Sequence, residues 1–276
     1  MATQQDAGIG LPAGTRRVAV QRGPGAPGAD GVAEEVPVAL EYNGISHAVM
    51  LATPLDLEDF ALGFSLTEGI VDSRADVREI ELVKGCGGLT VQLQIASGCF
   101  ARLKDKRRSL AGRTGCGLCG AESLPQAVQR PAPLQSAARF EAAAVSQAVR
   151  ALDLRQPLRD ASGATHAAGF ADAQGRLLLV REDVGRHNAL DKLVGALLAA
   201  NRPAQDGFVV VTSRASYEMV GKTVRAGSAL LAAVSGVTGL AIDHAADANL
   251  ALVGFARGDR LSVYTHPERV LWPAAA

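Results

Sequence analysis

The sequence lacks the features that mark exported and membrane proteins. None of its apolar runs approaches the roughly 20 residues that a membrane-spanning helix needs. Residues 1–30 are rich in Gly, Ala, Pro and Gln and contain no apolar core, so they predict a disordered tail and not a signal peptide. We therefore expect a cytoplasmic protein without membrane contact, in a compartment that keeps thiols mostly reduced.

An excess of charge of either sign is also missing. The 28 basic and 28 acidic residues balance, which argues against a broad nucleic-acid-binding face. No Gly-x-x-x-x-Gly-Lys loop is present, and this disfavours nucleotide hydrolysis. With 48% apolar and 20% charged residues, the 276-residue chain can bury a sizeable core in one large or two modest domains.

Cysteine is scarce, and its distribution is uneven. Of the four cysteines, Cys116 and Cys119 lie three positions apart, whereas Cys86 and Cys99 are isolated. The close pair belongs to residues 112–120, Gly-Arg-Thr-Gly-Cys-Gly-Leu-Cys-Gly. Glycine frees the backbone and removes side-chain bulk that would shield sulfur, so this segment indicates chemistry on sulfur and not packing.

Three kinds of sulfur chemistry fit this pair. A structural zinc site usually takes four ligands as two close pairs, and only one close pair is present, although distant ligands can converge in space. A thioredoxin-like centre needs a strand before the first cysteine and a helix at the second, and glycines surround this pair instead. A persulfide carrier suits a swinging Gly-rich loop, and Arg113 would favour the reactive thiolate of Cys116.

The first half of the chain shows a mixed pattern of strands and helices. Two alternating strands around Asn43-Gly44 predict a hairpin within residues 35–51. Thr53-Pro54 is typical of a helix start, and further strands are expected at 77–83 and 89–95. We predict an N-terminal α+β part over residues 31–124 that ends in the mobile CxxC loop. The three prolines in residues 125–135 indicate a linker.

The second half, residues 136–276, alternates strands with helices. We expect a hairpin of residues 165–170 and 176–181 around Gly175, and a last, antiparallel strand at 261–265. The other expected strands are 208–212, 229–234 and 250–255, and the expected helices are 140–152, 189–200, 216–225 and 238–248. This alternation predicts right-handed crossovers and a parallel core.

Polar loops follow three of these strands. They are residues 212–216, 235–239 and 255–260. Ligands of open α/β sheets bind beyond the carboxyl ends of the strands, and helix N-termini there attract anions. In the last loop Arg257 and Arg260 offer forked donors for phosphate, and Phe255 could stack on a base. The three loops together predict a site for a nucleotide-like ligand.

A charged segment, residues 182–188 (Glu-Asp-Val-Gly-Arg-His-Asn), precedes one of the expected helices. Capping is one interpretation, with His187 or Asn188 as the cap and Asp191 in the first turn. The other interpretation makes this segment a polar wall of the ligand site. His166 and His244 lie among small apolar residues, which favours interior or surface histidines over ligands.

Several stretches together point to a family. The segment 112–120 resembles the signature of the formate dehydrogenase accessory sulfurtransferases, the FdhD-type proteins. The resemblance extends to residues 67–70, 165–168, 182–189, 213–220 and 254–257, and it covers residues 35–270. The combined set is far more specific than any one piece.

The resemblance implies a function and its residues. Such a sulfurtransferase takes sulfur from a cysteine desulfurase as a cysteine persulfide. It passes the sulfur to the bis(molybdopterin guanine dinucleotide) molybdenum cofactor before this enters formate dehydrogenase. By resemblance, Cys116 matches the persulfide-forming position and Cys119 the second cysteine, with no metal held directly by the protein. The cofactor-contacting segment falls on Phe255, Ala256, Arg257, Gly258, Asp259 and Arg260.

The resemblance also implies a fold and an assembly. It is an α/β, cytidine-deaminase-like three-layer sandwich with a mostly parallel central sheet, a smaller N-terminal α+β part, and a homodimeric state. The zinc deaminase signature is absent, so deamination is not expected. Two alternatives stay open: a molybdenum-cofactor-binding chaperone without sulfur chemistry, and a zinc-stabilised structural protein.

Overall fold

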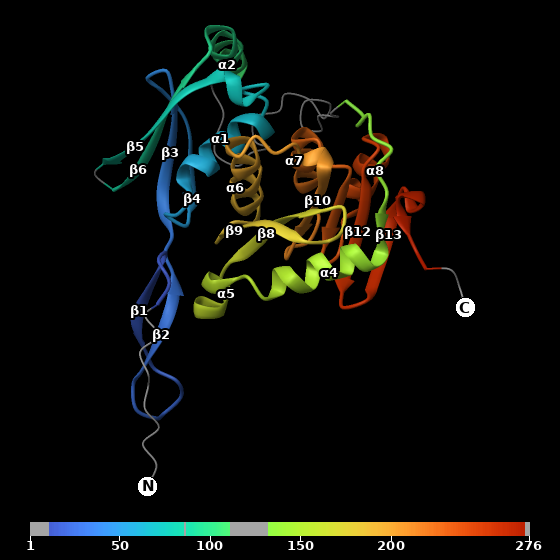
Figure 1. Ribbon diagram of the computed structural model, residues 1–276. Coiled ribbons are helices and arrows are strands. Elements are labelled where there is room, and N and C mark those ends of the chain that lie inside the picture. The colour runs from blue at the N-terminus through green and yellow to red at the C-terminus, as the bar shows by residue number, and fades with distance from the viewer. Residues whose placement is uncertain (1–10, 86, 111–131, 274–276) are drawn as a thin grey trace.

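The structure is a computed structural model that describes residues 11–85, 87–110 and 132–273 (Figure 1). Cys116, Cys119 and Cys86, together with most of the predicted linker, lie outside the described residues. No helix in the described ranges combines the length and the hydropathy that crossing a membrane requires.

The N-terminal part is built on a four-stranded sheet with the strand order β4-β3-β6-β5. The strands are β3 (Val36–Tyr42), β4 (Ile45–Ala52), β5 (Val77–Gly85) and β6 (Gly88–Ile95). The predicted hairpin is confirmed, because Asn43 and Gly44 both take the positive φ that its tight turn requires. Helix α1 (Leu57–Thr67) packs on one face of this sheet, and α2 (Ser97–Leu110) follows β6.

The prediction of a disordered tail over residues 1–30 is wrong for its second half. β1 (Thr15–Val20) and β2 (Gly28–Ala33) form an antiparallel hairpin, the arm at the lower left of Figure 1. Gly23, one of the glycines that suggested disorder, takes a positive φ between the two strands. Gly31, just past the predicted tail, allows a close approach, because a Cβ there would lie 2.6 Å from the carbonyl oxygen of Ala161.

The start of α1 also differs from expectation. The helix begins at Leu57, after Asp56 in the left-handed conformation, and not at Thr53-Pro54. Thr53 is fully buried and binds the other half of the chain instead, since its hydroxyl oxygen accepts from the Val184 N–H at 3.2 Å. A tertiary hydrogen bond has replaced the local cap that the sequence suggested.

The C-terminal part is built on a six-stranded sheet with the order β13-β12-β11-β10-β8-β9. The strands are β8 (His166–Asp172), β9 (Leu177–Asp183), β10 (Gly207–Val211), β11 (Leu230–Ala233), β12 (Ala251–Arg257) and β13 (Arg260–Thr265). The predicted parallel core of β10, β11 and β12 is confirmed, as are the β8–β9 hairpin and the antiparallel β13.

Helices cover both faces of this sheet, which gives three layers. One face carries α6 (Arg186–Ala199), α7 (Tyr217–Ala226) and α8 (Gly239–Asp247). The other face carries α4 (Ala142–Asp153), which leads into the short α5 (Pro157–Ser162) (Figure 1). Short strands β7 (Phe140–Glu141) and β14 (Val270–Leu271) pair beside α4.

The expectation of a mostly parallel sheet is wrong. Only the β10–β11 and β11–β12 ladders are parallel, whereas β8, β9 and β13 pair antiparallel to their neighbours. The hairpin of β8 and β9 adds two antiparallel strands beside β10, and β13 adds a third at the other edge. Three of the six strands are therefore paired antiparallel to their neighbours. The cytidine-deaminase likeness and the domain limits after the tail stay predictions.

The two parts are joined by the packing of α1 against α6. A Cβ on Gly63 would lie 1.8 Å from the carbonyl oxygen of Asp191, and a Cβ on Gly195 would lie 1.8 Å from that of Asp59. The two glycines therefore let the helix backbones approach to a distance that no larger residue allows. Arg181 of β9 adds a second link between the two parts, a hydrogen-bonded ion pair to Asp59 of α1 at 2.7 Å.

Candidate functional site

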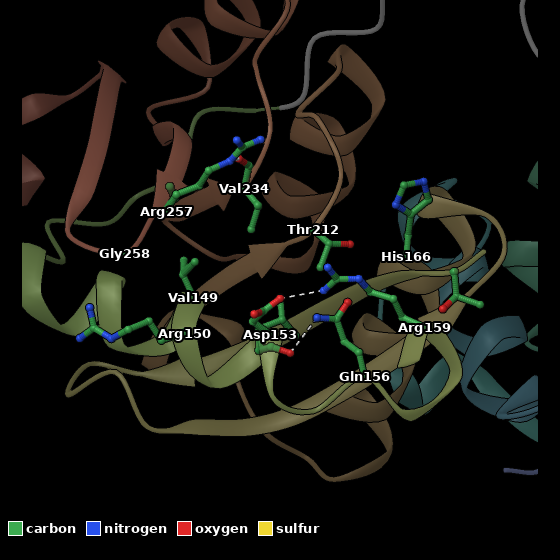
Figure 2. Close-up of a pocket in the computed structure, with 13 residues that line it drawn as sticks. Val149, Arg150, Asp153, Gln156, Arg159, His166, Thr212, Val234, Arg257 and Gly258 are labelled. Atoms are coloured by element: carbon green, nitrogen blue, oxygen red, sulfur yellow. Dashed lines mark hydrogen bonds and ion pairs between the residues drawn. The ribbon is translucent and has the colours of Figure 1, made fainter. Parts of the chain in front are cut away.

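A pocket of about 470 Å³ lies at the carboxyl ends of the three parallel strands, on the face that α4 covers (Figure 2). Thr212, Val234 and Ala256 contribute to it from the ends of β10, β11 and β12. Because parallel strands end at one edge of a sheet, the predicted meeting of these three strand ends is confirmed. The residues that follow Thr212 and Val234 do not line the pocket.

A β-bulge near the end of β12 shapes one wall of the pocket. The register with β13 shifts between Gly254 and Arg257, and Phe255 takes a left-handed backbone with φ 48°. This conformation is unfavourable for an aromatic residue and commonly marks a functional site. The bulge leaves Phe255 50% exposed and Ala256 fully buried, and it brings Arg257 to the pocket.

The pocket is rich in arginine, but its arginines differ in their pairing. Arg150 binds Asp259 at 2.6 Å, and Arg159 binds Asp153 at 2.7 Å. Arg257 donates from Nε to the Val234 carbonyl oxygen at 3.1 Å, and no carboxylate of the described residues lies within ion-pair distance of it. Arg257 is thus the cation of this pocket that is ready for an anionic ligand.

His166 reaches the pocket rim from the start of β8 (Figure 2). Burial, and after it the nearby Arg186 guanidinium, lower the pKa of His166 below its ordinary value. The ring is therefore neutral at pH 7 and adds no charge to the pocket. No sequence pattern placed His166 here, because it stands among small apolar residues.

Of the six predicted cofactor-binding residues, three line the pocket and three do not. Ala256, Arg257 and Gly258 line the pocket. Phe255, Asp259 and Arg260 do not line it. Phe255 packs beside Gly236, and Asp259 forms an ion pair with Arg150. Cys116 and Cys119 lie outside the described residues, so their roles stay predictions.

The opposite wall was missed by the sequence analysis. It comes from the end of α4 and the start of α5, with Arg150, Asp153, Gln156 and Arg159. A helix was expected over 140–152, but polar residues at a helix end are usually surface residues. Only the tertiary fold turns this helix end toward the strand ends.

Residues 182–188 organise the pocket without lining it. Glu182 accepts hydrogen bonds from the N–H groups of Leu158 at 3.0 Å and Arg159 at 2.9 Å, and thereby caps α5. Asp183 forms a fully buried ion pair with Lys192 at 2.7 Å. Such a pair resists the removal of either partner, since the remaining charge would be buried alone. The segment therefore clamps α5 and α6 in place.

The expected capping by His187 or Asn188 is not what the structure shows. The N-cap of α6 is Gly185, without a side-chain cap. The Asn188 amide donates to the Leu51 carbonyl oxygen at 2.8 Å and to Asp183 at 2.9 Å, which ties the N-terminal sheet to α6. His187 lies 3.1 Å from the Glu218 carboxylate.

Asp191 also has a role other than the expected one. It is buried and accepts from the Lys222 ammonium at 2.9 Å and from the Thr67 hydroxyl at 2.6 Å. Burial favours proton loss from Lys222, but the carboxylates of Asp191 and Glu68 outweigh it and raise the pKa of Lys222. The charged pair thus joins the interior of α6 and α7 to Thr67 at the C-terminal end of α1.

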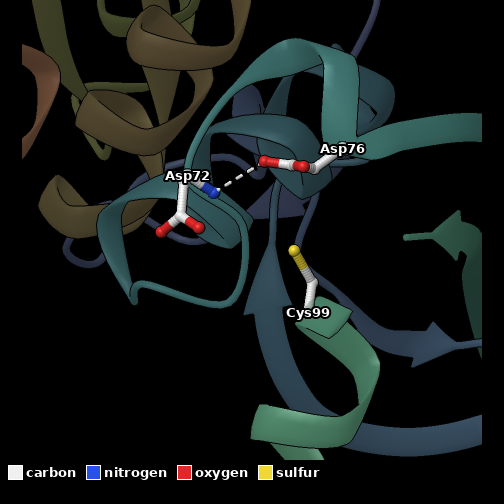
Figure 3. A group of neighbouring side chains, drawn as sticks. All are labelled: Asp72, Asp76 and Cys99. Carbon is white, nitrogen blue, oxygen red and sulfur yellow. Dashed lines mark hydrogen bonds between the residues drawn. The ribbon is translucent and has the colours of Figure 1, made fainter. Parts of the chain in front are cut away.

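Among the described residues, one group has the spacing of metal ligands: Asp72, Asp76 and Cys99 (Figure 3). Arg102 already binds two of its three members, because it donates to Asp72 at 2.6 Å and to the Cys99 sulfur at 3.4 Å. Asp76 accepts from the backbone N–H groups of Asp72 and Ser73, which lower the pKa of its carboxyl. The group is a turn cap with its own cation, and it gives no support to a zinc site.

Comparisons with known proteins agree on one family. A sequence model described as the FdhD/NarQ family matches residues 33–271. The chain is 58% identical over 241 residues to "Sulfur carrier protein FdhD" of Bordetella petrii, covering 87% of each chain. It is 60% identical over 241 residues to the protein of that name from Cupriavidus necator, covering 87% of this chain and 84% of the relative.

A solved structure is similar as well. The crystal structure of a formate dehydrogenase accessory protein from Desulfotalea psychrophila superimposes with a TM-score of 0.71 at 25% identity. The match covers 93% of this chain and 98% of that one, so the likeness includes both the four-stranded and the six-stranded parts.

Proposed function

The chain belongs to the FdhD/NarQ family, and we propose that it carries sulfur for the maturation of a formate dehydrogenase. The relatives named as sulfur carrier proteins support the first half of this proposal, and the similar accessory protein supports the second. In this role the chain takes sulfur from a cysteine desulfurase and passes it to the bis(molybdopterin guanine dinucleotide) molybdenum cofactor, its substrate.

The pocket at the strand ends is the observation that carries the cofactor half of the proposal. Its volume of about 470 Å³ suits part of a nucleotide, and Arg257, whose guanidinium is held only by the Val234 carbonyl oxygen, offers the remaining N–H groups to a phosphate. The pocket walls are largely preformed, since Glu182 caps α5 on one side and the β12 bulge fixes Arg257 on the other. A dinucleotide cofactor brings phosphates that fit this wall.

Cys116 carries the sulfur half of the proposal. The Cys116 thiolate attacks the terminal sulfur of the desulfurase persulfide, an S–S bond forms on Cys116, and the desulfurase cysteine leaves as a thiolate. Cys119 assists as the second thiol. Cytoplasmic location, a homodimer and a deaminase-like fold complete the proposal.

Persulfide labelling tests the carrier role. Wild-type protein incubated with a cysteine desulfurase and cysteine should gain about 32 Da, one sulfur atom, on Cys116. The Cys116→Ala variant should gain none. Cys99→Ala is the matched control, because Cys99 is buried and bound by Arg102, and it should be labelled like the wild type. Undiminished labelling of Cys116→Ala would overturn the carrier role.

A formate dehydrogenase assay separates the carrier from a cofactor chaperone. The Cys116→Ala/Cys119→Ala variant keeps every residue of the pocket described above. If it yields inactive formate dehydrogenase that is poor in sulfur, sulfur transfer is required. Full activity of the enzyme would favour the chaperone without sulfur chemistry.

A further inference from the structure

One buried polar atom in the pocket wall has no partner. Gln156 is 1% exposed and lines the pocket beside the end of α4 (Figure 2). Its side-chain Nε2 donates to the Leu152 carbonyl oxygen at 3.0 Å, whereas its Oε1 accepts no hydrogen bond within the described part of the chain. Buried acceptors without donors are rare in folded proteins, so this oxygen calls for a donor from outside the chain.

The orientation of this amide follows from its hydrogen bond. Only the NH₂ end of a glutamine amide can donate to the Leu152 carbonyl, so the oxygen must occupy the other position. The backbone at Gln156 is held as well, because it precedes α5, whose first N–H groups bind Glu182. Thr165 steadies Glu182 in turn, with a hydroxyl donated at 3.1 Å. The acceptor is thus preorganised.

The two walls of the pocket therefore offer different chemical groups to a ligand. At the α4–α5 wall Gln156 offers an acceptor, and the neighbouring Asp153 is occupied by Arg159. At the β12 wall Arg257 offers donors and positive charge. A complementary ligand carries N–H donors at one end and an anionic group at the other, which describes a nucleotide whose base presents N–H groups.

We propose that Gln156 selects the base of the bound nucleotide by accepting N–H donors from guanine. This inference rests on the proposed cofactor-binding function of the pocket. A carbonyl oxygen has two lone pairs, and guanine presents two adjacent donors, N1–H and the 2-amino group. Adenine presents a 6-amino donor beside the N1 acceptor, which would face the Gln156 oxygen unfavourably. Gln156 is a specificity-determining residue for guanine over adenine.

Calorimetry with free nucleotides on the full chain tests the inference. Wild-type protein should bind GDP more tightly than ADP, and inosine diphosphate, which lacks the 2-amino group, should lie between them. Gln156→Leu should weaken GDP binding about tenfold or more, as expected for lost base-edge contacts, and should bring GDP and ADP to similar affinities. Gln135→Leu, at an exposed glutamine outside the pocket, is the matched control with unchanged affinities.

The outcomes separate this inference from the function on which it rests. Equal GDP affinity of the wild type and Gln156→Leu overturns the role of Gln156 and leaves the cofactor pocket standing. Absence of GDP binding to the wild type overturns both. If Gln156→Leu fails to fold, the wild-type series decides alone: equal binding of GDP, inosine diphosphate and ADP would refute base selection.

Discussion

Arg257 shows how pairing decides the role of a single side chain. Arg150 and Arg159 lie in the same pocket, but each is bound to a carboxylate at 2.7 Å or less. A paired guanidinium must give up its partner before it binds a phosphate, whereas Arg257 is held only by the Val234 carbonyl. We therefore expect Arg257 to provide the principal phosphate contact.

The Arg257→Ala variant tests this ranking. Loss of a charge-assisted hydrogen bond should weaken GDP binding by about 1.5–3 kcal/mol, measured by calorimetry. Arg176→Ala removes an exposed arginine that pairs with Asp172 in the β8–β9 hairpin, outside the pocket, and should leave the affinity unchanged. Equal affinities of Arg257→Ala and the wild type would move the anion site to another strand end.

At the scale of elements, the α1–α6 contact holds the two sheets in one arrangement. Gly63 and Gly195 permit the close approach, and the buried Asp191–Lys222 pair joins α6 to α7 and, through the Thr67 hydroxyl, to the end of α1. These features come from segments far apart in the sequence. Their local signals were weak, because a helical glycine is ordinarily only a poor helix former.

The Gly195→Ala substitution should be strongly destabilising. The added Cβ would meet the Asp59 carbonyl oxygen at 1.8 Å, so α1 must shift away from α6. We expect a loss of about 1–3 kcal/mol in the free energy of unfolding, measured in urea, as for other overpacked sites.

Gly221→Ala in α7 is the matched control for this experiment. Its added Cβ would meet only the His244 Nε2 at 3.5 Å, an ordinary contact. There the lower entropy of the unfolded chain should stabilise the protein by about 0.4–1 kcal/mol. If both variants have the same stability, the close approach of α1 and α6 has no energetic importance.

At the scale of the whole molecule, two partly buried histidines link stability to pH. Burial, and after it Arg186, lower the pKa of both His166 and His187, and for His187 the Glu218 carboxylate opposes this shift. The unfolded chain then binds protons at a higher pH than the folded chain. Stability is therefore retained above the ordinary histidine pKa of about 6.5 and is lost as the pH falls below it.

Urea unfolding at pH 7.5 and at pH 5.5 measures this effect. The wild type should be less stable at pH 5.5, at which the carboxyl groups of Asp76 and Asp172, with lowered pKa values, are still ionised. His187→Gln should lose less stability between the two pH values, because it removes one of the two rings described here with a lowered pKa. An identical loss in the variant and the wild type would contradict this origin of the pH dependence.

Local patterns predicted most of the elements because their physical cause is local. Asn43-Gly44 suits its turn whatever surrounds it, and the buried run of β10 reflects cover on both faces of the sheet. The tail failed as a prediction because its few apolar residues gave no sign of a hairpin that leans on α5 through Gly31. The prediction of Thr53 as a helix cap was wrong because its hydroxyl oxygen accepts from the Val184 N–H and not from a helix start.

By itself, the sequence determined the family, the parallel strands β10 to β12 and the position of Arg257 at the end of one of them, since periodicity and motifs are properties of the chain. Only the tertiary structure decided that α4 and α5 close the pocket and that Gln156 presents a buried acceptor there. It also decided that Asp191 pairs with Lys222. These facts depend on burial and on contacts between distant segments, and no local pattern of residues carries them.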